Sequence, residues 1–114
     1  MMEDWRITLA SALARIPDDP AADRYAEPLR HGTMRLGLYT PSWSDEQAPH
    51  RQDELYIVAR GTGGFVKNGE HIQFAPNDVL FVEAGAEHRF VDFSDDFAAW
   101  VVFWGPHGGE SSAE

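Results

Sequence analysis

The chain has no cysteine among its 114 residues. Disulfide bonds, thiolate metal sites and cysteine nucleophiles are therefore excluded, so any metal ion must bind imidazole, carboxylate, amide or water ligands. No apolar run approaches the roughly 20 residues that cross a membrane, and no apolar signal core follows the acidic first residues. We therefore expect a cytoplasmic protein.

Basic residues are scarce, with 9 Lys and Arg against 19 Asp and Glu, for a net charge of −10. Such a surface repels nucleic acid and anionic membranes, and we expect neither as a partner. The serines lie in loops or the tail without a paired base, and there is no Gly-x-Ser-x-Gly elbow. Nucleophilic catalysis is therefore not indicated.

Two kinds of hydrophobic periodicity divide the chain. Residues 3–16 place Trp5, Leu9 and Ile16 on one helical face, and Pro17 ends that segment. After residue 20 the pattern changes to short alternating or apolar runs separated by turn residues, which are typical of an antiparallel sandwich or barrel. The runs are 33–40, 54–60, 65–66, 71–74, 79–82, 88–92 and 97–104.

The turn between two of these runs is Asn68-Gly69, a pair that tolerates positive φ and predicts a tight hairpin. We expect one helix followed by about seven or eight strands. The predicted organisation is a helix and turn at 1–20, a β-barrel at 21–105 and a disordered tail at 106–114.

Three residues with metal-binding side chains stand out: His50, Glu54 and His88. Four residues of extended strand span about 13 Å, too far for His50 and Glu54 to share one ion. The chain must therefore fold back between them, and we expect residues 51–53 to form a tight turn between two strands. His88 would arrive from a third strand after a turn at Gly85. The interior of a nearly closed sheet would bring the three together around one divalent metal ion.

The spacing of these residues resembles the first motif of the cupin superfamily. His50, Glu54 and Gly61 match its second histidine, its glutamate and its final glycine, and Gly37 is a loose match for its first glycine. The sequence Glu-Leu-Tyr-Ile-Val-x-x-Gly from Glu54 is also typical of small single-domain cupins.

The second cupin motif is less complete in this chain. Gly85 and His88 match its Gly-x-x-His core, whereas Asn77, Glu83 and Asp92 replace its first glycine, its proline and its asparagine. The resemblance covers about residues 33–104. It implies an all-β fold, a cupin-type antiparallel β-barrel (a double-stranded β-helix or jelly roll), here with a short N-terminal α-helix.

Ala48 is the main departure, because it occupies the position of the first motif histidine. A full cupin ligand set would be three His and one Glu, and this chain keeps two His and one Glu. One reading is a triad with open coordination positions, which suits Fe(II) oxygen chemistry. The other is a pocket that works without metal. An amide oxygen from Gln47 or Gln52 is a less favoured substitute ligand.

The resemblance implies a divalent metal ion (Fe, Mn, Ni or Zn) and a small-molecule site in the barrel. If the protein is an enzyme, a dioxygenase or an isomerase is the implied class. The alternative is a non-catalytic binding or sensor cupin with a degenerate metal site, and a purely structural domain is a third reading. The fold hosts both catalysis and binding, so architecture does not decide between them.

Residues around the three candidate ligands complete the prediction. Tyr56 and Phe90 share strand faces with Glu54 and His88, so we expect them to line the pocket. Further expectations concern four residues: Trp43 and Trp100 as pocket-lining residues, and Gln52 and Asp92 as possible partners that orient a ligand. Asp53 is read as a solvated turn residue. The surplus of aromatic residues on a short barrel favours a homodimer.

Overall fold

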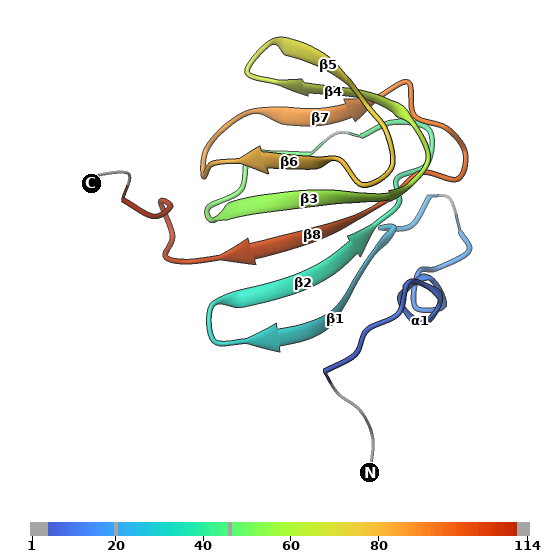
Figure 1. Ribbon diagram of the computed structural model, residues 1–114, viewed down its shortest axis with the longest axis horizontal. Helices are drawn as coiled ribbons and strands as arrows, with labels where there is room; N and C mark the ends of the chain where they lie inside the picture. The colour runs from blue at the N-terminus through green and yellow to red at the C-terminus, as the bar shows by residue number, and fades with distance from the viewer. Residues whose placement is uncertain (1–4, 20, 46, 112–114) are drawn as a thin grey trace.

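The computed structural model describes residues 5–19, 21–45 and 47–111 and contains one short helix followed by β-strands (Figure 1). The elements are α1 (Leu9–Leu13), β1 (Tyr25–His31), β2 (Met34–Tyr39), β3 (Asp53–Arg60), β4 (Gly63–Lys67), β5 (Glu70–Phe74), β6 (Val79–Val82), β7 (His88–Val91) and β8 (Ala98–Trp104). Residues 1–4 of the predicted helical segment and residues 112–114 of the predicted tail lie outside the described residues.

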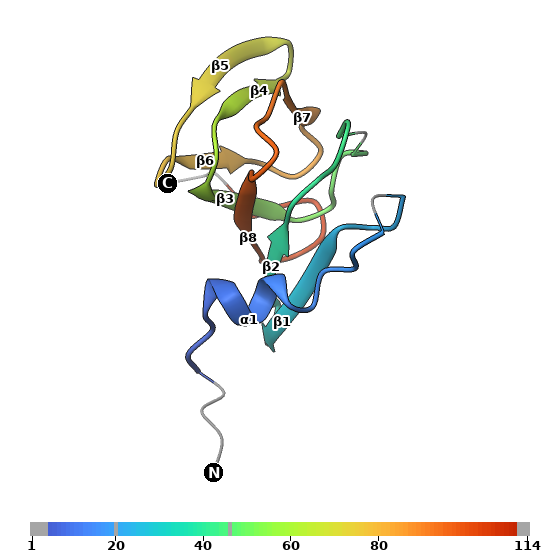
Figure 2. The same ribbon diagram turned by 90° about the vertical axis from the view of Figure 1, so that its right-hand side faces the viewer.

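The strands form two antiparallel sheets that curl over one interior (Figures 1 and 2). The five-stranded sheet has the order β1-β2-β8-β3-β6, and the three-stranded sheet has the order β5-β4-β7. The two sheets are not joined by hydrogen bonds into a closed cylinder. The antiparallel all-β fold expected from the sequence is confirmed.

Seven of the strands correspond to the predicted runs, and β1 is the additional one. Proline normally argues against a strand because it cannot donate to the ladder. In β1, Pro28 lies where the pairing with β2 shifts register between Ala26 and Leu29, and β1 is an edge strand. The bulge and the free edge are the two settings in which a strand accepts proline.

The N-terminal helix is shorter than predicted. Thr8 is its N-cap, with its side-chain oxygen accepting a hydrogen bond from the backbone N–H of Ser11 at 3.1 Å. The cap starts the helix at Leu9, so Trp5 precedes it and is 82% exposed. The placement of Trp5 on a packed helical face was therefore wrong. No helix among the described residues is long and apolar enough to cross a membrane.

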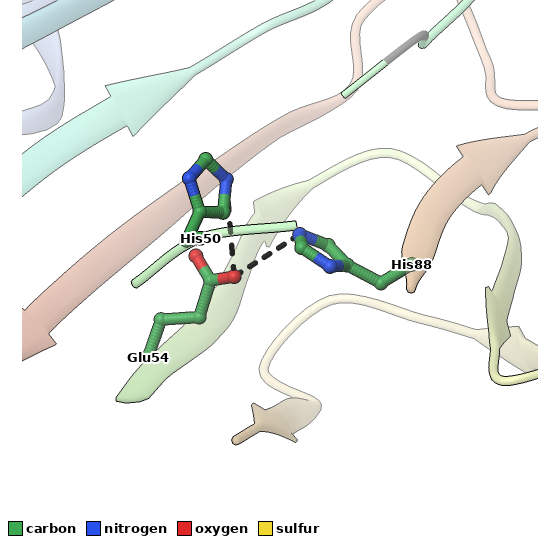
Figure 3. Close-up of side chains that lie close together, drawn as sticks. All are labelled: His50, Glu54 and His88. Atoms are coloured by element: carbon green, nitrogen blue, oxygen red, sulfur yellow. Dashed lines mark ion pairs between the residues drawn. The ribbon is translucent and has the colours of Figure 1, made fainter. Parts of the chain in front are cut away.

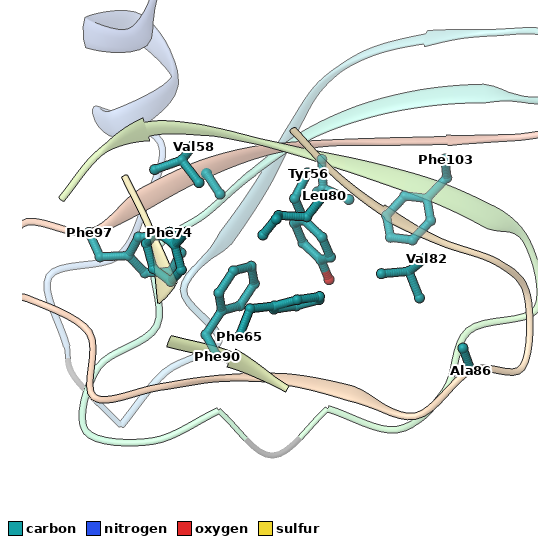
Figure 4. Packing of buried hydrophobic residues seen from close by; sticks show 12 residues of the cluster. Tyr56, Val58, Phe65, Phe74, Leu80, Val82, Ala86, Phe90, Phe97 and Phe103 are labelled. Atoms are coloured by element: carbon teal, nitrogen blue, oxygen red, sulfur yellow. The ribbon is translucent and has the colours of Figure 1, made fainter. Parts of the chain in front are cut away.

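The interior between the sheets is filled mainly by aromatic and branched side chains (Figure 4). The buried members include Val58 of β3, Phe65 of β4, Phe74 of β5, Phe90 of β7 and Phe97, which immediately precedes β8. Alternation along β8 points Val101 and Phe103 into this core. The core positions the inward-facing residues of β3 and β7 that form the candidate site.

A second, smaller cluster of apolar side chains lies on the outer face of β2 and β8 and includes residues of α1. Figure 2 shows α1 beside β1. Ala12 of α1, Leu38 of β2 and Ala98 of β8 are each 0% exposed. Trp100 packs against this cluster, so α1 covers part of the outer aromatic face. Trp100 and Phe103 therefore lie on opposite faces of β8.

Candidate metal centre

Glu54 and His88 reach the interior from two different sheets. Glu54 lies near the start of β3 and pairs with Val82 of β6 and Phe103 of β8, and its side chain is 0% exposed. His88 is the first residue of β7, and its side chain is also 0% exposed. The sheet register therefore brings these two side chains face to face.

His50 reaches the same place from a loop. It precedes a bend at Arg51 and Gln52 that leads into β3, so the expected strand ending at His50 is absent from the described residues. The backbone carbonyl of His50 accepts a hydrogen bond from the Gly85 N–H at 2.9 Å. Gly85 has φ +85, a conformation that glycine adopts readily, and its turn leads into β7. This contact holds the His50 loop beside the turn that delivers His88.

The three side chains present their donor atoms to one another (Figure 3). His88 Nε2 lies 3.0 Å from Glu54 Oε1, and His50 Nε2 lies 3.9 Å from the same oxygen. One donor atom from each residue fits within a group no more than 4.8 Å across. Atoms bound to one ion at about 2.0–2.2 Å are at most about 4.4 Å apart, so small side-chain movements would let a single ion contact all three residues.

Glu54 is the residue whose surroundings fit a cation best. Both of its carboxylate oxygens are buried, and neither accepts a hydrogen bond from any described residue. A buried carboxylate is strongly destabilising unless it is paired or coordinates a metal. Among the described residues, Glu54 forms ion pairs with the two imidazoles, and these are neutral when they act as metal ligands. The residues present therefore fit a divalent metal ion.

The environments of the two histidines shift their pKa values in opposite directions. Burial lowers the pKa of His50, an effect that outweighs the opposing charge of Glu54 and is reinforced by His88 and Arg35. Burial also acts to lower the pKa of His88, but the adjacent Glu54 carboxylate and the Ala86 carbonyl raise it above its ordinary value. The His88 Nδ1 atom lies 3.0 Å from that carbonyl, which leaves Nε2 facing Glu54.

The loop before His50 adds one polar residue, Asp45, that sequence analysis did not assign to the site. Asp45 is 5% exposed, and its carboxylate accepts hydrogen bonds from Tyr39 Oη at 2.6 Å, the Phe90 backbone N–H at 2.7 Å and Gln47 Nε2 at 2.9 Å. The only sequence signal was an acidic residue in a loop next to the motif. The Asp45 contacts connect that loop to both sheets.

Tyr56 lies beside the cluster on the inner face of β3. Its hydroxyl lies 3.3 Å from His88 Nε2 and donates a hydrogen bond to Gln47 Oε1 at 3.2 Å. Burial, together with the charge of Glu54, raises the pKa of Tyr56 well above its ordinary value. Tyr56 therefore stays protonated at neutral pH and acts as a hydrogen-bond donor rather than a base.

A cavity of about 420 Å³ opens onto this cluster. It is lined by Asp23, Tyr25, Arg35, Tyr39, Gln47, His50, Tyr56, Val101 and Phe103. The Arg35 guanidinium stacks on Phe103 with its Cζ atom 4.4 Å from the ring centroid. Gly37 leaves room for the ring of Tyr25, because a Cβ at Gly37 would lie 2.3 Å from that ring. The cavity volume is within the usual range of small-molecule sites.

Of the predicted pocket-lining residues, only Tyr56 lines this cavity. Phe90 is 1% exposed and lies deeper, stacked edge-on against Tyr56 with ring centroids 4.9 Å apart. Trp43 is 87% exposed in its loop, and Trp100 lies on the outer face beneath α1. These three residues therefore do not line this cavity. Neither residue spacing nor alternation gave the direction of the loop or the depth of the core.

The residues expected to support the ligands lie elsewhere. Gln52 accepts a hydrogen bond from Arg35 and donates to the Gly105 carbonyl at 2.8 Å, without a hydrogen bond to the three candidate ligands. Asp92 follows the end of β7 and is exposed. Asp53 is 6% exposed and accepts backbone N–H groups of Ala84 and Glu110, so its interpretation as a solvated turn residue was wrong.

Comparisons with known proteins agree with this architecture. The chain is 38% identical over 84 residues to a Streptomyces coelicolor protein named Uncharacterized protein SCO3923, a match that covers 72% of this chain and 80% of that protein. A cupin superfamily protein from Desulfitobacterium hafniense superposes with a TM-score of 0.67 at 16% identity, covering 93% of this chain and 95% of that one.

A Cupin 2 conserved barrel domain protein from Salinispora arenicola superposes with a TM-score of 0.66 at 21% identity. That match covers 92% of this chain and 90% of the other. At these identities the solved structures establish the fold alone. The sequence profile of the cupin domain matches residues 36–104, which contain all three candidate ligands. The chain therefore belongs to the cupin domain family.

Proposed function

We propose that the protein binds one divalent metal ion through His50, Glu54 and His88 and holds a small molecule in the adjoining cavity. The observation that carries the proposal is the Glu54 carboxylate, which is fully buried between two imidazoles and accepts no hydrogen bond from a described residue. A cation at this position would compensate the buried negative charge of Glu54 while both imidazoles stay neutral.

The donor set indicates which metals fit. Two imidazole nitrogens and one carboxylate suit Fe, Mn, Ni or Zn, and three protein ligands leave coordination positions for a small molecule. When bound, such an ion supplies Lewis-acid chemistry or a site for oxygen. A dioxygenase or an isomerase is the proposed class of enzyme if the protein turns its ligand over.

The chain's own residues would hold and orient the small molecule. The cavity lining includes His50, which is one of the three candidate ligands. It also includes Gln47 and Tyr56, which lie within hydrogen-bonding distance of His50 and His88, respectively. Tyr56 keeps its proton because its pKa is raised, so it offers a hydrogen-bond donor next to the candidate metal position. Val101 and Phe103 give the cavity an apolar wall.

The test is elemental analysis of untagged protein purified without chelator, beside His88→Ala. We expect near-stoichiometric divalent metal in the wild-type protein and its loss in the variant. His71→Ala is the matched control, because His71 is exposed on β5 and should retain wild-type metal content. Wild-type protein that contains no more metal than His88→Ala, and that also fails to bind added Mn²⁺ or Co²⁺, would contradict the proposal.

A non-catalytic binding or sensor protein is the second candidate function. The observation that favours it is that Ala48 replaces the first motif histidine. The substitution Ala48→His separates the alternatives once a small-molecule ligand has been found by screening. If the wild type turns the ligand over and Ala48→His abolishes turnover, an open coordination position is needed for catalysis. Binding without turnover in both proteins supports the sensor.

A further inference from the structure

The side-chain amide of Gln47 has a defined orientation. Its Nε2 atom lies 2.9 Å from Asp45 Oδ2. An ionised carboxylate only accepts hydrogen bonds, so the NH₂ group of Gln47 must face Asp45 and the carbonyl oxygen must point the other way. Asp45 is itself fixed by Tyr39 from β2 and by the Phe90 backbone N–H from β7. The two sheets together therefore set the direction of the Gln47 carbonyl.

That carbonyl oxygen points at the candidate metal centre. Gln47 Oε1 lies 3.0 Å from His50 Nε2 and 3.2 Å from the Tyr56 hydroxyl. The Tyr56 hydroxyl in turn lies 3.3 Å from His88 Nε2. Ligand atoms at right angles around one ion, with bonds of about 2.1 Å, lie about 3.0 Å apart. The spacing between Gln47 Oε1 and His50 Nε2 equals that of two adjacent ligands.

We propose that Gln47 Oε1 is a fourth protein ligand of the divalent ion and that Asp45 is the residue that positions it. The inference rests on the proposed metal-binding function and extends it. The family motif places a histidine at position 48, where this chain has alanine, and Gln47 supplies an amide oxygen from the neighbouring position. Gln52, the other glutamine considered as a substitute ligand, instead forms hydrogen bonds with Arg35 and the Gly105 carbonyl.

An amide oxygen in place of the motif histidine changes the set of donor atoms at the site. A set of three imidazoles and one carboxylate offers three nitrogen atoms and one oxygen, whereas this set offers two of each. Oxygen ligands favour harder ions, so the site should prefer Mn²⁺ or Fe²⁺ more strongly than a site with three imidazoles would. The amide is also neutral, so its oxygen adds a ligand without adding charge to the buried Glu54.

The experiment is a Co²⁺ titration of the wild type and Gln47→Met, followed by isothermal calorimetry and by visible absorption. Methionine has a similar length and lacks the amide. We expect about a tenfold increase in the Co²⁺ dissociation constant of Gln47→Met. We also expect a changed absorption spectrum at Co²⁺ saturation, because water would replace one protein ligand. A variant that only mispositioned His50 would bind more weakly but show the wild-type spectrum when saturated.

Two further variants make the outcomes distinct. Gln73→Met makes the same change at an exposed position of β5 and should leave both the dissociation constant and the spectrum unchanged. His88→Ala should lose Co²⁺ binding if the proposed metal site exists. If His88→Ala loses binding but Gln47→Met keeps the wild-type dissociation constant or the wild-type saturated spectrum, the role of Gln47 as a ligand is wrong and the three-residue site stands. If the wild type binds no Co²⁺, both proposals fail.

Discussion

The two ends of the interior have opposite chemistry although the same strands build both. We call the end that holds His50, Glu54 and His88 the site end, and the end that holds Val58 and Phe97 the closed end (Figure 4). Along β3, the inward-facing residues change from Glu54 and Tyr56 at the site end to Val58 at the closed end. A step of two residues on one strand therefore leads from the candidate site to the core.

The difference indicates that the two ends of the interior contribute differently to stability and to metal binding. At the closed end, Phe97 is 1% exposed and its ring centroid lies 5.0 Å from that of Phe74 and 4.8 Å from that of Phe90. At the site end, Glu54 is a buried charge without a hydrogen bond from a described residue. Aromatic burial stabilises the fold, and a buried uncompensated charge destabilises it. We expect stability to depend on the closed end and metal affinity on the site end.

The largest effect should come from removing a ring at the closed end. Phe97→Ala deletes a buried ring that contacts the rings of Phe74, Phe90 and Phe93, so we expect a loss of about 3–5 kcal/mol in the free energy of unfolding. Urea denaturation measures it. Phe81→Ala is the control, because Phe81 is 48% exposed on β6 and should lose about 1 kcal/mol or less. Equal losses in the two variants would contradict the division between the ends.

The second-largest effect on stability is expected at the site end, and it should appear only when metal is bound. Mn²⁺ at 100 times its dissociation constant should stabilise the wild type by about 2.7 kcal/mol. Glu54→Gln should lose this gain while its metal-free stability stays within about 1 kcal/mol of the wild type, because the change removes a buried charge. Thermal unfolding with and without Mn²⁺ measures both quantities. Glu70→Gln, an exposed change on β5, should keep the full response.

Glycine-to-alanine substitutions should also destabilise the closed end more than an exposed turn. Gly61 has φ +89, and a Cβ there would lie 2.6 Å from the Phe97 Cα at the closed end. Gly69 has φ +85 but no atom within 4 Å of such a Cβ. Gly61→Ala should therefore lose about 2–3 kcal/mol through strain and overlap, and Gly69→Ala about 1 kcal/mol through strain alone. Denaturant unfolding of both variants provides the comparison, and a smaller loss at Gly61 would contradict it.

The smallest effect should come from an exposed carboxylate, the counterpart of Glu54. The hydrogen bond from Lys67 Nζ at 2.6 Å lowers the pKa of Glu83. A lowered carboxyl pKa stabilises the fold above the ordinary pKa, and this contribution is lost as the pH falls through the folded-state pKa. Because water screens the pair, Glu83→Gln should lose only about 0.5 kcal/mol at neutral pH and nothing in acid. A constant difference across the pH range would show another cause.

Regular periodicity made most of the fold predictable. The alternating runs located the strands from β2 to β8, and Asn68-Gly69 located a hairpin whose two residues have φ values of 49 and 85. The strand β1 was missed because Pro28 argues against a strand unless a bulge and a free edge are known in advance. The helix was extended too far because Trp5 fits the helical period, although Thr8 caps the helix after it.

Motif spacing predicted the candidate ligands but not their surroundings. The structure brings His50, Glu54 and His88 together, and their role in binding metal stays a prediction. The contacts of Asp45 and Gln47 depend on the path of an irregular loop, which no residue spacing encodes. The burial of Asp53 depends on backbone N–H groups from residues 31 and 57 positions later in the chain.

The position of β8 in the larger sheet has a consequence for the order of folding. β8 lies between β2 and β3 and pairs with both, although it is the last strand in the chain. During synthesis, β2 and β3 therefore cannot complete their pairing until residues 98–104 have been made. Until then each strand presents an unpaired edge. Pairings so distant in sequence form slowly. We expect the nascent chain to need protection from aggregation until β8 leaves the ribosome, and the site end to assemble only after that step.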